Sequence, residues 1–165
     1  MSCMNIRQVG FDHPDAVRLS DEVLLEYVER YGPEDNGDAT PLDPSMFAPP
    51  QGLFLIAYDE TGEPLATGGW RAQDDNPEGY ADGDAELKRM YVVPQARGRG
   101  LARRILAALE DDAKAAGRSR MVLSTGSEQP EAIALYASSG YLTAPTTFGH
   151  YRDHEDVRCF AKPLA

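Results

Sequence analysis

The sequence predicts a single α/β domain of the α+β kind, spanning residues 1–165. The chain is 165 residues long and 42% hydrophobic, which is enough to close one sizeable core. Strand-like runs alternate with runs whose hydrophobic residues recur every three or four positions, the pattern of amphipathic helices. Two neighbouring strand-like runs joined by a short polar turn indicate an antiparallel hairpin.

The first third of the chain predicts a strand, helical structure and an irregular connection. Residues 4–9 are a short strand candidate. From Pro14, hydrophobic residues at helical spacing predict one or two amphipathic helices, which end at Gly32. Residues 32–52 contain five prolines and several acids, so they predict an irregular connection.

A hairpin and a long strand are predicted next. Residues 52–58 and 64–71 have strand character, and the turn between them contains Gly62, which can adopt a positive φ. After a polar loop, residues 85–93 predict a long strand that stops at Pro94.

The remaining elements alternate helix and strand. Hydrophobic residues at helical spacing from Gly98 onward predict a helix that Gly117 closes. Residues 121–124 predict a short buried strand, a second helix ends at Gly140, and residues 157–161 predict the last strand.

Charge is distributed unevenly along the chain. Residues 1–86 contain 19 acids and 4 bases, residues 87–109 contain 6 bases and no acid, and residues 110–165 contain 8 acids and 6 bases. The net charge of −11 argues against a nucleic-acid binder and against a polybasic membrane-surface protein. A run of like charges is ordinarily a solvated helix face, but this basic run also contains a glycine turn.

Cysteine and histidine usage points to neither disulfides nor a metal. Cys3 and Cys159 form no disulfide framework, and His13, His150 and His154 are too scattered for a metal site. The N-terminus has no basic flank followed by an apolar run, so we expect a cytoplasmic protein without a signal peptide or membrane span.

The basic stretch contains a turn suited to phosphate. A predicted strand runs into Gly98-Arg99-Gly100, and a helix begins at once. Glycine lets the backbone approach a ligand closely, and the free N–H groups of a helix start favour an anion. Four arginines add positive charge: Arg97, Arg99, Arg103 and Arg104. We therefore expect a diphosphate group as the ligand of this turn.

Two common phosphate-binding patterns do not fit this turn. An NTP-binding P-loop needs Lys and Ser or Thr after its second glycine, where Leu101 and Ala102 stand. The dinucleotide fingerprint needs a third glycine, where Arg103 stands. ATP and NAD are therefore disfavoured as ligands.

The turn and a second motif resemble the GCN5-related N-acetyltransferase (GNAT) family. The family signature Gln/Arg-x-x-Gly-x-Gly/Ala is matched by Gln95, Gly98 and Gly100. Residues 129–141 are similar to the family's Asn-x-x-Ala-x-x-Leu-Tyr-x-x-x-Gly-Phe motif, with Gln129 in place of the Asn.

This resemblance implies a fold and a cofactor. The family fold is a mixed, mostly antiparallel sheet of six to seven strands, flanked by about four helices and splayed between the fourth and fifth strands. Acetyl-CoA lies in the gap, with its diphosphate on the turn and its pantetheine arm paired with the fourth strand. By similarity, the cofactor contacts are Tyr91, Val92, Val93, Gln95, Arg97, Gly98, Arg99, Gly100, Leu101, Ala102, Arg103 and Gln129.

The resemblance also implies direct transfer of an acetyl group to an amine. An amine near the lysine reference pKa of about 10.4 is mostly protonated at neutral pH, so a base is required. Glu86 is the candidate base, directly or through a water, and Tyr136 the candidate acid for the departing thiolate. A backbone N–H near Val92 would stabilise the developing oxyanion. Without the motif, Tyr136 would be interpreted as a core residue and Glu86 as a solvated one.

The last expectations concern the chemical class of the acceptor and the oligomeric state. Residues 72–86 contain six acids and no base, which favours a cationic amine of a small molecule or peptide. A non-catalytic acyl-CoA sensor or interaction module on the same fold is the alternative. The resemblance implies a monomer or a homodimer.

Overall fold

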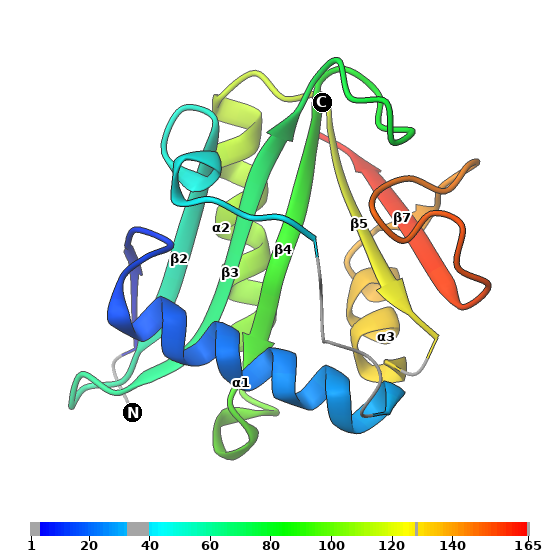
Figure 1. Ribbon diagram of the computed structural model, residues 1–165. Coiled ribbons are helices and arrows are strands. Elements are labelled where there is room, and N and C mark those ends of the chain that lie inside the picture. The colour runs from blue at the N-terminus through cyan, green and yellow to red at the C-terminus, as the bar shows by residue number, and fades with distance from the viewer. Residues whose placement is uncertain (1–3, 33–39, 128, 165) are drawn as a thin grey trace.

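The computed structural model describes residues 4–32, 40–127 and 129–164. Its central element is a mixed sheet of seven strands (Figure 1). The strand order is β1-β2-β3-β4-β5-β7-β6, and within these ranges every neighbouring pair except β4 and β5 is antiparallel. The predicted mixed, mostly antiparallel sheet is confirmed. The strands are β1 (Asn5–Gln8), β2 (Gly52–Tyr58), β3 (Pro64–Gln73), β4 (Asp84–Val92), β5 (Arg120–Gly126), β6 (Leu142–Thr143) and β7 (Val157–Pro163).

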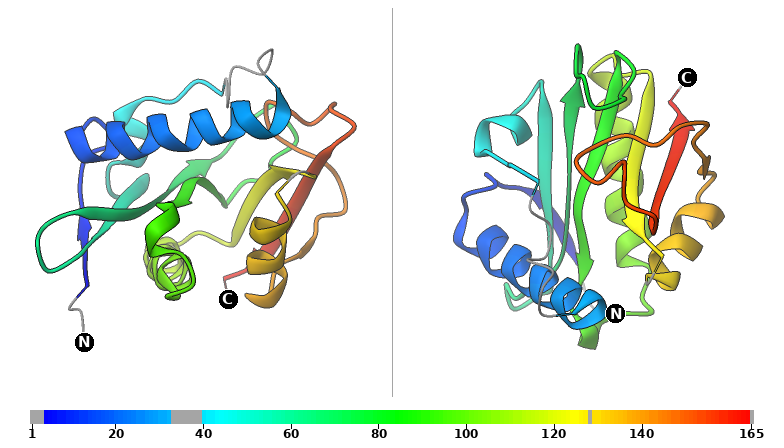
Figure 2. Two further views of the ribbon diagram at one scale, coloured as in Figure 1. Left: turned by 90° about the horizontal axis from the view of Figure 1, so that it is seen from below. Right: turned by 45° about the vertical axis from the view of Figure 1, so that its right-hand side comes forward.

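Helices cover both faces of this sheet. The described ranges contain the α-helices α1 (Pro14–Tyr31), α2 (Leu101–Ala115) and α3 (Pro130–Ser138), and the short 3-10 helices Pro44–Phe47 and Pro94–Ala96. Figure 2 shows α1 against one face, and α2 and α3 against the other. In none of these described helices do length and apolar character together reach what a bilayer span requires.

Three local features differ from the sequence expectations or sharpen them. The region predicted as one or two helices is the single helix α1, since no glycine or proline interrupts it after its first residue. The segment predicted to be irregular contains a 3-10 helix opened by Pro44 and capped by Asp43, whose carboxylate accepts a hydrogen bond from Ser45 N at 3.0 Å. The two-residue strand β6 is too short to produce a periodic pattern.

Helix α2 is held firmly against the sheet, and this fixes the turn that precedes it. Its buried side chains recur on one face, including Leu101, Ile105 and Leu109. The fully buried indole of Trp70 on β3 also donates a hydrogen bond of 2.9 Å to Asp112. Burying one such Leu or Ile side chain contributes about 1.5–3 kcal/mol to folding, so the start of α2 is a rigid platform.

The sheet is splayed between β4 and β5. These strands pair only at Asp84 with Arg120, Ala85 with Met121 and Glu86 with Val122, while both continue for several residues beyond these pairs. Figure 1 shows them close together at one end and diverging toward the other. The predicted gap between the fourth and fifth strands is confirmed, and it leaves this edge of β4 without a β5 partner.

A bulge distorts β4 beside the gap. Thr67 pairs with Tyr91 and Gly69 with Lys88, so two residues of β4 face the single residue Gly68 of β3. Within this bulge Arg89 adopts a φ of +60°, a strained value for a residue with a side chain. The hydroxyl of Thr67 donates a 2.8 Å hydrogen bond to the carbonyl of Arg89 and holds the bulge in place.

Candidate active site

The glycine turn has the backbone form of an anion site. Gly98 has a φ of +83° and Gly100 a φ of +77°, and a Cβ added at either would meet no atom within 4 Å. Glycine is therefore needed for the dihedral angle, and the space beside the turn is open. The carbonyl of Gly100 accepts the first bond of α2, from Arg104 N at 3.2 Å, so the N–H groups of the first helical turn have no acceptor within the helix.

Two of the four predicted arginines, Arg97 and Arg103, are hydrogen-bonded within the protein. Arg97 donates to the carbonyl of Val92 at 2.9 Å and to Glu26 of α1 at 2.8 Å. Arg103 donates to the hydroxyls of Ser138 and Ser139 and thereby joins α2 to the end of α3. Arg99 is exposed. A diphosphate on this turn would compete with Glu26 for Arg97.

Two adjoining cavities extend from the turn into the gap between the strands. The turn cavity lies along the glycine turn and the end of β4. Its lining includes most of the predicted cofactor contacts: Tyr91, Val92, Arg97, Gly98, Gly100, Leu101, Ala102, Arg103 and Gln129. The other predicted contacts lie outside it. Val93 is buried and bonded to Leu65, while Gln95 and Arg99 are exposed.

The strand-gap cavity occupies the space where β4 and β5 diverge. It is lined by residues 87–90 of β4, residues 123–126 of β5, parts of α1 and α3, and the loop before β7. The two cavities share Tyr27, Met90, Gln129, Ala132 and Tyr136. A ligand on the glycine turn could therefore reach the strand gap without leaving the protein surface.

Tyr136 lies where the two cavities meet. It belongs to α3, is 5% exposed and packs edge-on against Tyr141 with ring centroids 5.6 Å apart. Burial, together with neighbouring Tyr27, raises the pKa of Tyr136. Its phenol therefore stays protonated at neutral pH, as a proton donor must.

Gln129, the residue that departs from the resembled motif, also lines both cavities. Its side-chain amide donates to the Tyr31 hydroxyl at 3.3 Å. That hydroxyl packs so closely on Gly126 that a Cβ there would overlap it. The ends of α1 and β5 and the start of α3 thus meet at one point of the cavity wall.

Glu86, the predicted base, lines neither cavity. Its side chain is 3% exposed and accepts hydrogen bonds from Arg71 Nε at 2.7 Å, Gln73 Nε2 at 3.0 Å and the Tyr80 hydroxyl at 2.6 Å. Burial alone would favour the neutral acid, but the charges of Lys88 and Arg71 and these hydrogen bonds outweigh it, and the pKa of Glu86 is lowered. The carboxylate is a fixed, satisfied anion, and the structure does not bring it into contact with the space beside Tyr136.

Most carboxylates of the acidic segment 72–86 are paired with arginines from elsewhere in the chain. Each pair has nitrogen and oxygen atoms 2.7–3.2 Å apart, and the pairs are Glu86 with Arg71, Asp74 with Arg118, Glu78 with Arg152 and Asp84 with Arg120. The strand-gap cavity, by contrast, is lined by Lys88 and Arg89 and by Asp156. The arginines therefore offset much of the negative charge on which the expectation of a cationic acceptor rested.

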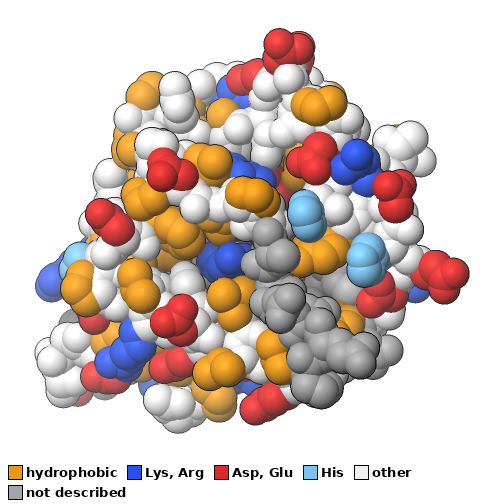
Figure 3. Space-filling view, viewed as in Figure 1, with side chains coloured by type: hydrophobic (Ala, Val, Ile, Leu, Met, Phe, Trp, Pro, Cys, Tyr) orange, Lys and Arg blue, Asp and Glu red, His pale blue; other side chains and the backbone are white. Residues whose placement is uncertain are grey.

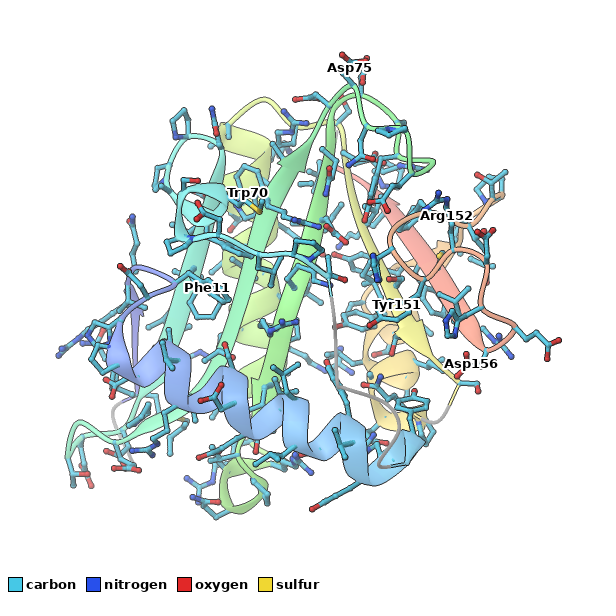
Figure 4. The ribbon with its side chains drawn as sticks, in the orientation of Figure 1. Phe11, Trp70, Asp75, Tyr151, Arg152 and Asp156 are labelled. Carbon is cyan, nitrogen blue, oxygen red and sulfur yellow. The ribbon has the colours of Figure 1, made fainter. Side chains whose placement is uncertain are left out.

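Sequence reasoning passed over several side chains of the strand-gap cavity. Tyr27 and Tyr31 are four residues apart on α1, a spacing that places them on one helix face and was available as a signal. Tyr151, His154 and Asp156 come from the irregular loop before β7, where no periodic pattern places them. Figure 4 shows Tyr151 and Asp156 near β5, on the loop that approaches the gap.

Comparison with known proteins decides the family. The sequence model of the acetyltransferase (GNAT) family matches residues 17–141, which is most of the chain. The protein belongs to the GNAT family. This family of acetyltransferases is the one that the resemblance of the motifs implied. The glycine turn, the splayed strands and Tyr136 are therefore features of a GNAT domain.

Relatives and solved structures agree with this assignment. An IAA acetyltransferase of Azospirillum brasilense is 38% identical, over 86% of this chain and 88% of its own. An uncharacterised N-acetyltransferase of Schizosaccharomyces pombe is 32% identical, over 73% of each chain. A Klebsiella pneumoniae protein named as an acyl-CoA N-acyltransferase matches with a TM-score of 0.79 at 28% identity, over 98% of both chains. A Salmonella typhimurium protein named as an acetyltransferase, solved with its cofactor acetyl-CoA, shares the GNAT fold at a TM-score of 0.70 and 19% identity, over 98% of this chain and 94% of its own.

Proposed function

We propose that this GNAT protein is an acetyl-CoA-dependent N-acetyltransferase that moves an acetyl group directly to a primary amine of a small molecule or peptide. The observation that carries the proposal is the continuity of the two cavities, which meet at Tyr136. The turn cavity lies beside backbone N–H groups that suit a diphosphate, and the strand-gap cavity leaves room for an acceptor. A donor and an acceptor can thus meet beside a proton donor.

The residues that would hold the cofactor fit its chemistry. The open space beside Gly98 and Gly100 and the N–H groups that begin α2 suit a diphosphate. Beyond Glu86, β4 has no pairing with β5, so its edge can hydrogen-bond the amide groups of a pantetheine arm. When bound, acetyl-CoA supplies an activated acetyl group as a thioester.

Two groups of the chain then assist the transfer, a backbone N–H of β4 and the phenol of Tyr136. A backbone N–H of β4 in the neighbourhood of Val92 stabilises negative charge on the carbonyl oxygen. Tyr136 returns a proton to the departing sulfur, a role that its buried, protonated phenol suits. Since most acids of segment 72–86 are paired, we propose an acceptor without a requirement for positive charge beyond the reacting amine itself.

A thiol-release assay with acetyl-CoA and a broad panel of amines tests the proposal. Release that depends on an added amine, together with acetylated amine detected by mass spectrometry, supports the transferase. Tight binding of acetyl-CoA with no release from any amine would instead favour the acyl-CoA sensor.

A further inference from the structure

The proposed transfer needs a base on the acceptor side, and the described part of the strand-gap cavity offers few. Glu86 lines neither cavity, and both of its oxygens already accept hydrogen bonds. Glu26 and Glu131 line the turn cavity, where they are paired with Arg97 and Arg30. Among the described residues that line the strand-gap cavity, the proton acceptors are His154 and Asp156. A neutral imidazole offers one ring nitrogen as a proton acceptor, and a carboxylate beside its other nitrogen can orient the ring.

His154 is held in place at the rim of that cavity. Its backbone N–H donates to the carbonyl of Tyr151 at 3.0 Å, its own carbonyl accepts from Val157 N at 3.3 Å, and the rings of Tyr151 and His154 meet edge-on at 5.3 Å. Arg152 pairs with Glu78 at 3.2 Å and ties the same loop to the acidic segment. Figure 4 shows the labelled residues of this loop beside β5. The imidazole is therefore carried by an anchored turn.

Asp156 completes a pair with His154. Its Oδ1 lies 3.9 Å from Nδ1 of His154, and its backbone carbonyl accepts a 3.0 Å hydrogen bond from Ser127 at the end of β5. The side-chain separation is longer than a hydrogen bond, and such contacts commonly tighten when a substrate binds. A proton on Nδ1 directed at this carboxylate would leave Nε2 as the acceptor.

The other titratable groups around this imidazole come from three elements. Lys88 and Arg89 of β4, Tyr27 and Tyr31 of α1, and Tyr136 of α3 line the same cavity. Figure 3 shows imidazoles beside hydrophobic side chains on the face toward the viewer. His154 and Asp156 therefore line the same cavity as the candidate acid Tyr136, and they do not line the turn cavity.

On the basis of the proposed function, we propose that His154 is the base that deprotonates the acceptor amine, and that Asp156 positions it. Nε2 of His154 takes one proton from the ammonium group. The amine nitrogen then bonds to the thioester carbonyl carbon, the carbon–sulfur bond breaks, Tyr136 gives a proton to the sulfur, and the nitrogen loses its second proton to solvent. Solvent that enters the cavities lined by Tyr136 reprotonates its phenol, and solvent takes the proton from His154, so each turnover releases one proton.

The exposure of the two candidate bases supports this assignment. The His154 side chain is 65% exposed, so its proton can leave to water after each turnover, whereas the Glu86 side chain is 3% exposed. An exposed side chain also tolerates substitution, so a His154 variant is expected to fold.

The test compares His154→Gln with the matched control His150→Gln. His150 lies in the same loop and also contacts Tyr151, with ring centroids 4.9 Å apart, but it lines neither cavity. For an alkylamine acceptor, His154→Gln should lower kcat/KM about 10²-fold, and the pH profile should lose the limb in which the wild-type rate rises with imidazole deprotonation. The dissociation constant of acetyl-CoA should stay unchanged, and His150→Gln should behave as wild type.

A second acceptor separates proton removal from a structural defect. With an amine that is already neutral at pH 7, such as an aromatic amine, the loss caused by His154→Gln should largely disappear. A wild-type pH profile in His154→Gln, with the limb lost in Glu86→Gln instead, would overturn His154 as the base. No amine-dependent thiol release from wild type would overturn the proposed transferase and this inference together.

Discussion

The phenol of Tyr80 donates a 2.6 Å hydrogen bond to Oε2 of Glu86, while Arg71 and Gln73 donate to Oε1. Both oxygens of a nearly fully buried carboxylate are thereby satisfied. Burial, followed by the charge of Glu86, raises the pKa of Tyr80, so the phenol remains a donor across the working pH range. Glu86 belongs to the last residue pair that β4 and β5 form, so this cluster lies where the sheet begins to open.

Replacing Glu86 with Gln should destabilise the protein by about 3 kcal/mol, because Arg71 would lose its carboxylate while it remains buried. The pKa of Glu86 is lowered on folding, so the stabilisation is complete above the ordinary glutamate value of 4.5 and is lost as pH falls through the folded value. Urea unfolding of both proteins at pH 7 and at pH values below 4.5 measures this. The difference should shrink in acid; a difference that stays constant would contradict the ionised pair.

Tyr136→Phe should lower kcat by about 10²–10⁴ and leave the dissociation constant of acetyl-CoA nearly unchanged. Burial raises the pKa of Tyr136 above the ordinary 10.0, so the wild-type rate should not decline where ordinary tyrosines ionise. Tyr141→Phe is the matched control, because that ring packs on Tyr136 but donates its hydroxyl to Glu110. Steady-state thiol release measures both variants, and wild-type turnover by Tyr136→Phe would reject the acid role.

The elements that could be predicted from sequence are those whose signals are local. Gly98 and Gly100 adopt the positive φ values that a phosphate turn requires, and the buried stripe of α2 follows from its helical spacing. The gap between β4 and β5 was expected only through the resemblance of the motifs, since no periodic pattern indicates where two strands stop pairing.

The features that sequence reasoning missed depend on contacts between distant segments. The bulge at Arg89 arises from register with β3, and four acids of segment 72–86 pair with arginines that lie 15 to 74 residues away in the chain. The side chains of Tyr151 and His154 reach the cavity from an irregular loop. A count of acids along the chain does not reveal that four of the six acids of this segment are paired with arginines.

Because most acids of segment 72–86 are paired, an amine with a second positive charge and one of similar size without it should be acetylated with similar kcat/KM. The ratio of the two values should change little between low salt and about 0.15 M, where exposed charges are screened beyond about 8 Å. Measuring both acceptors at two ionic strengths checks this. A strong preference for the amine with the second charge at low salt that salt abolishes would show that the acidic segment steers acceptors after all.

Gly100→Ala should weaken coenzyme A binding about tenfold, which corresponds to about 1.4 kcal/mol. Its φ of +77° strains any other residue by about 1–2 kcal/mol, and the new Cβ would enter the open space beside the turn. Gly62→Ala is the matched control, since Gly62 has a φ of +85°, equally open surroundings and a place in the β2–β3 turn. Calorimetric titration and thermal unfolding should show equal losses of stability but a loss of affinity in Gly100→Ala alone. Equal affinities would place the diphosphate elsewhere.

Glu26→Gln should tighten coenzyme A binding, because Glu26 holds Arg97 at 2.8 Å beside the glycine turn and would repel a diphosphate there. The pair is partly exposed, so the gain should be about 0.2–1 kcal/mol, up to about fivefold in affinity, and should fade at high salt. Glu29→Gln is the control, since Glu29 is exposed on the same helix and lines neither cavity. Calorimetry at two salt concentrations measures both variants. Weaker binding by Glu26→Gln at low salt would mean that Glu26 positions Arg97 for the phosphates, whereas tighter binding identifies it as their competitor.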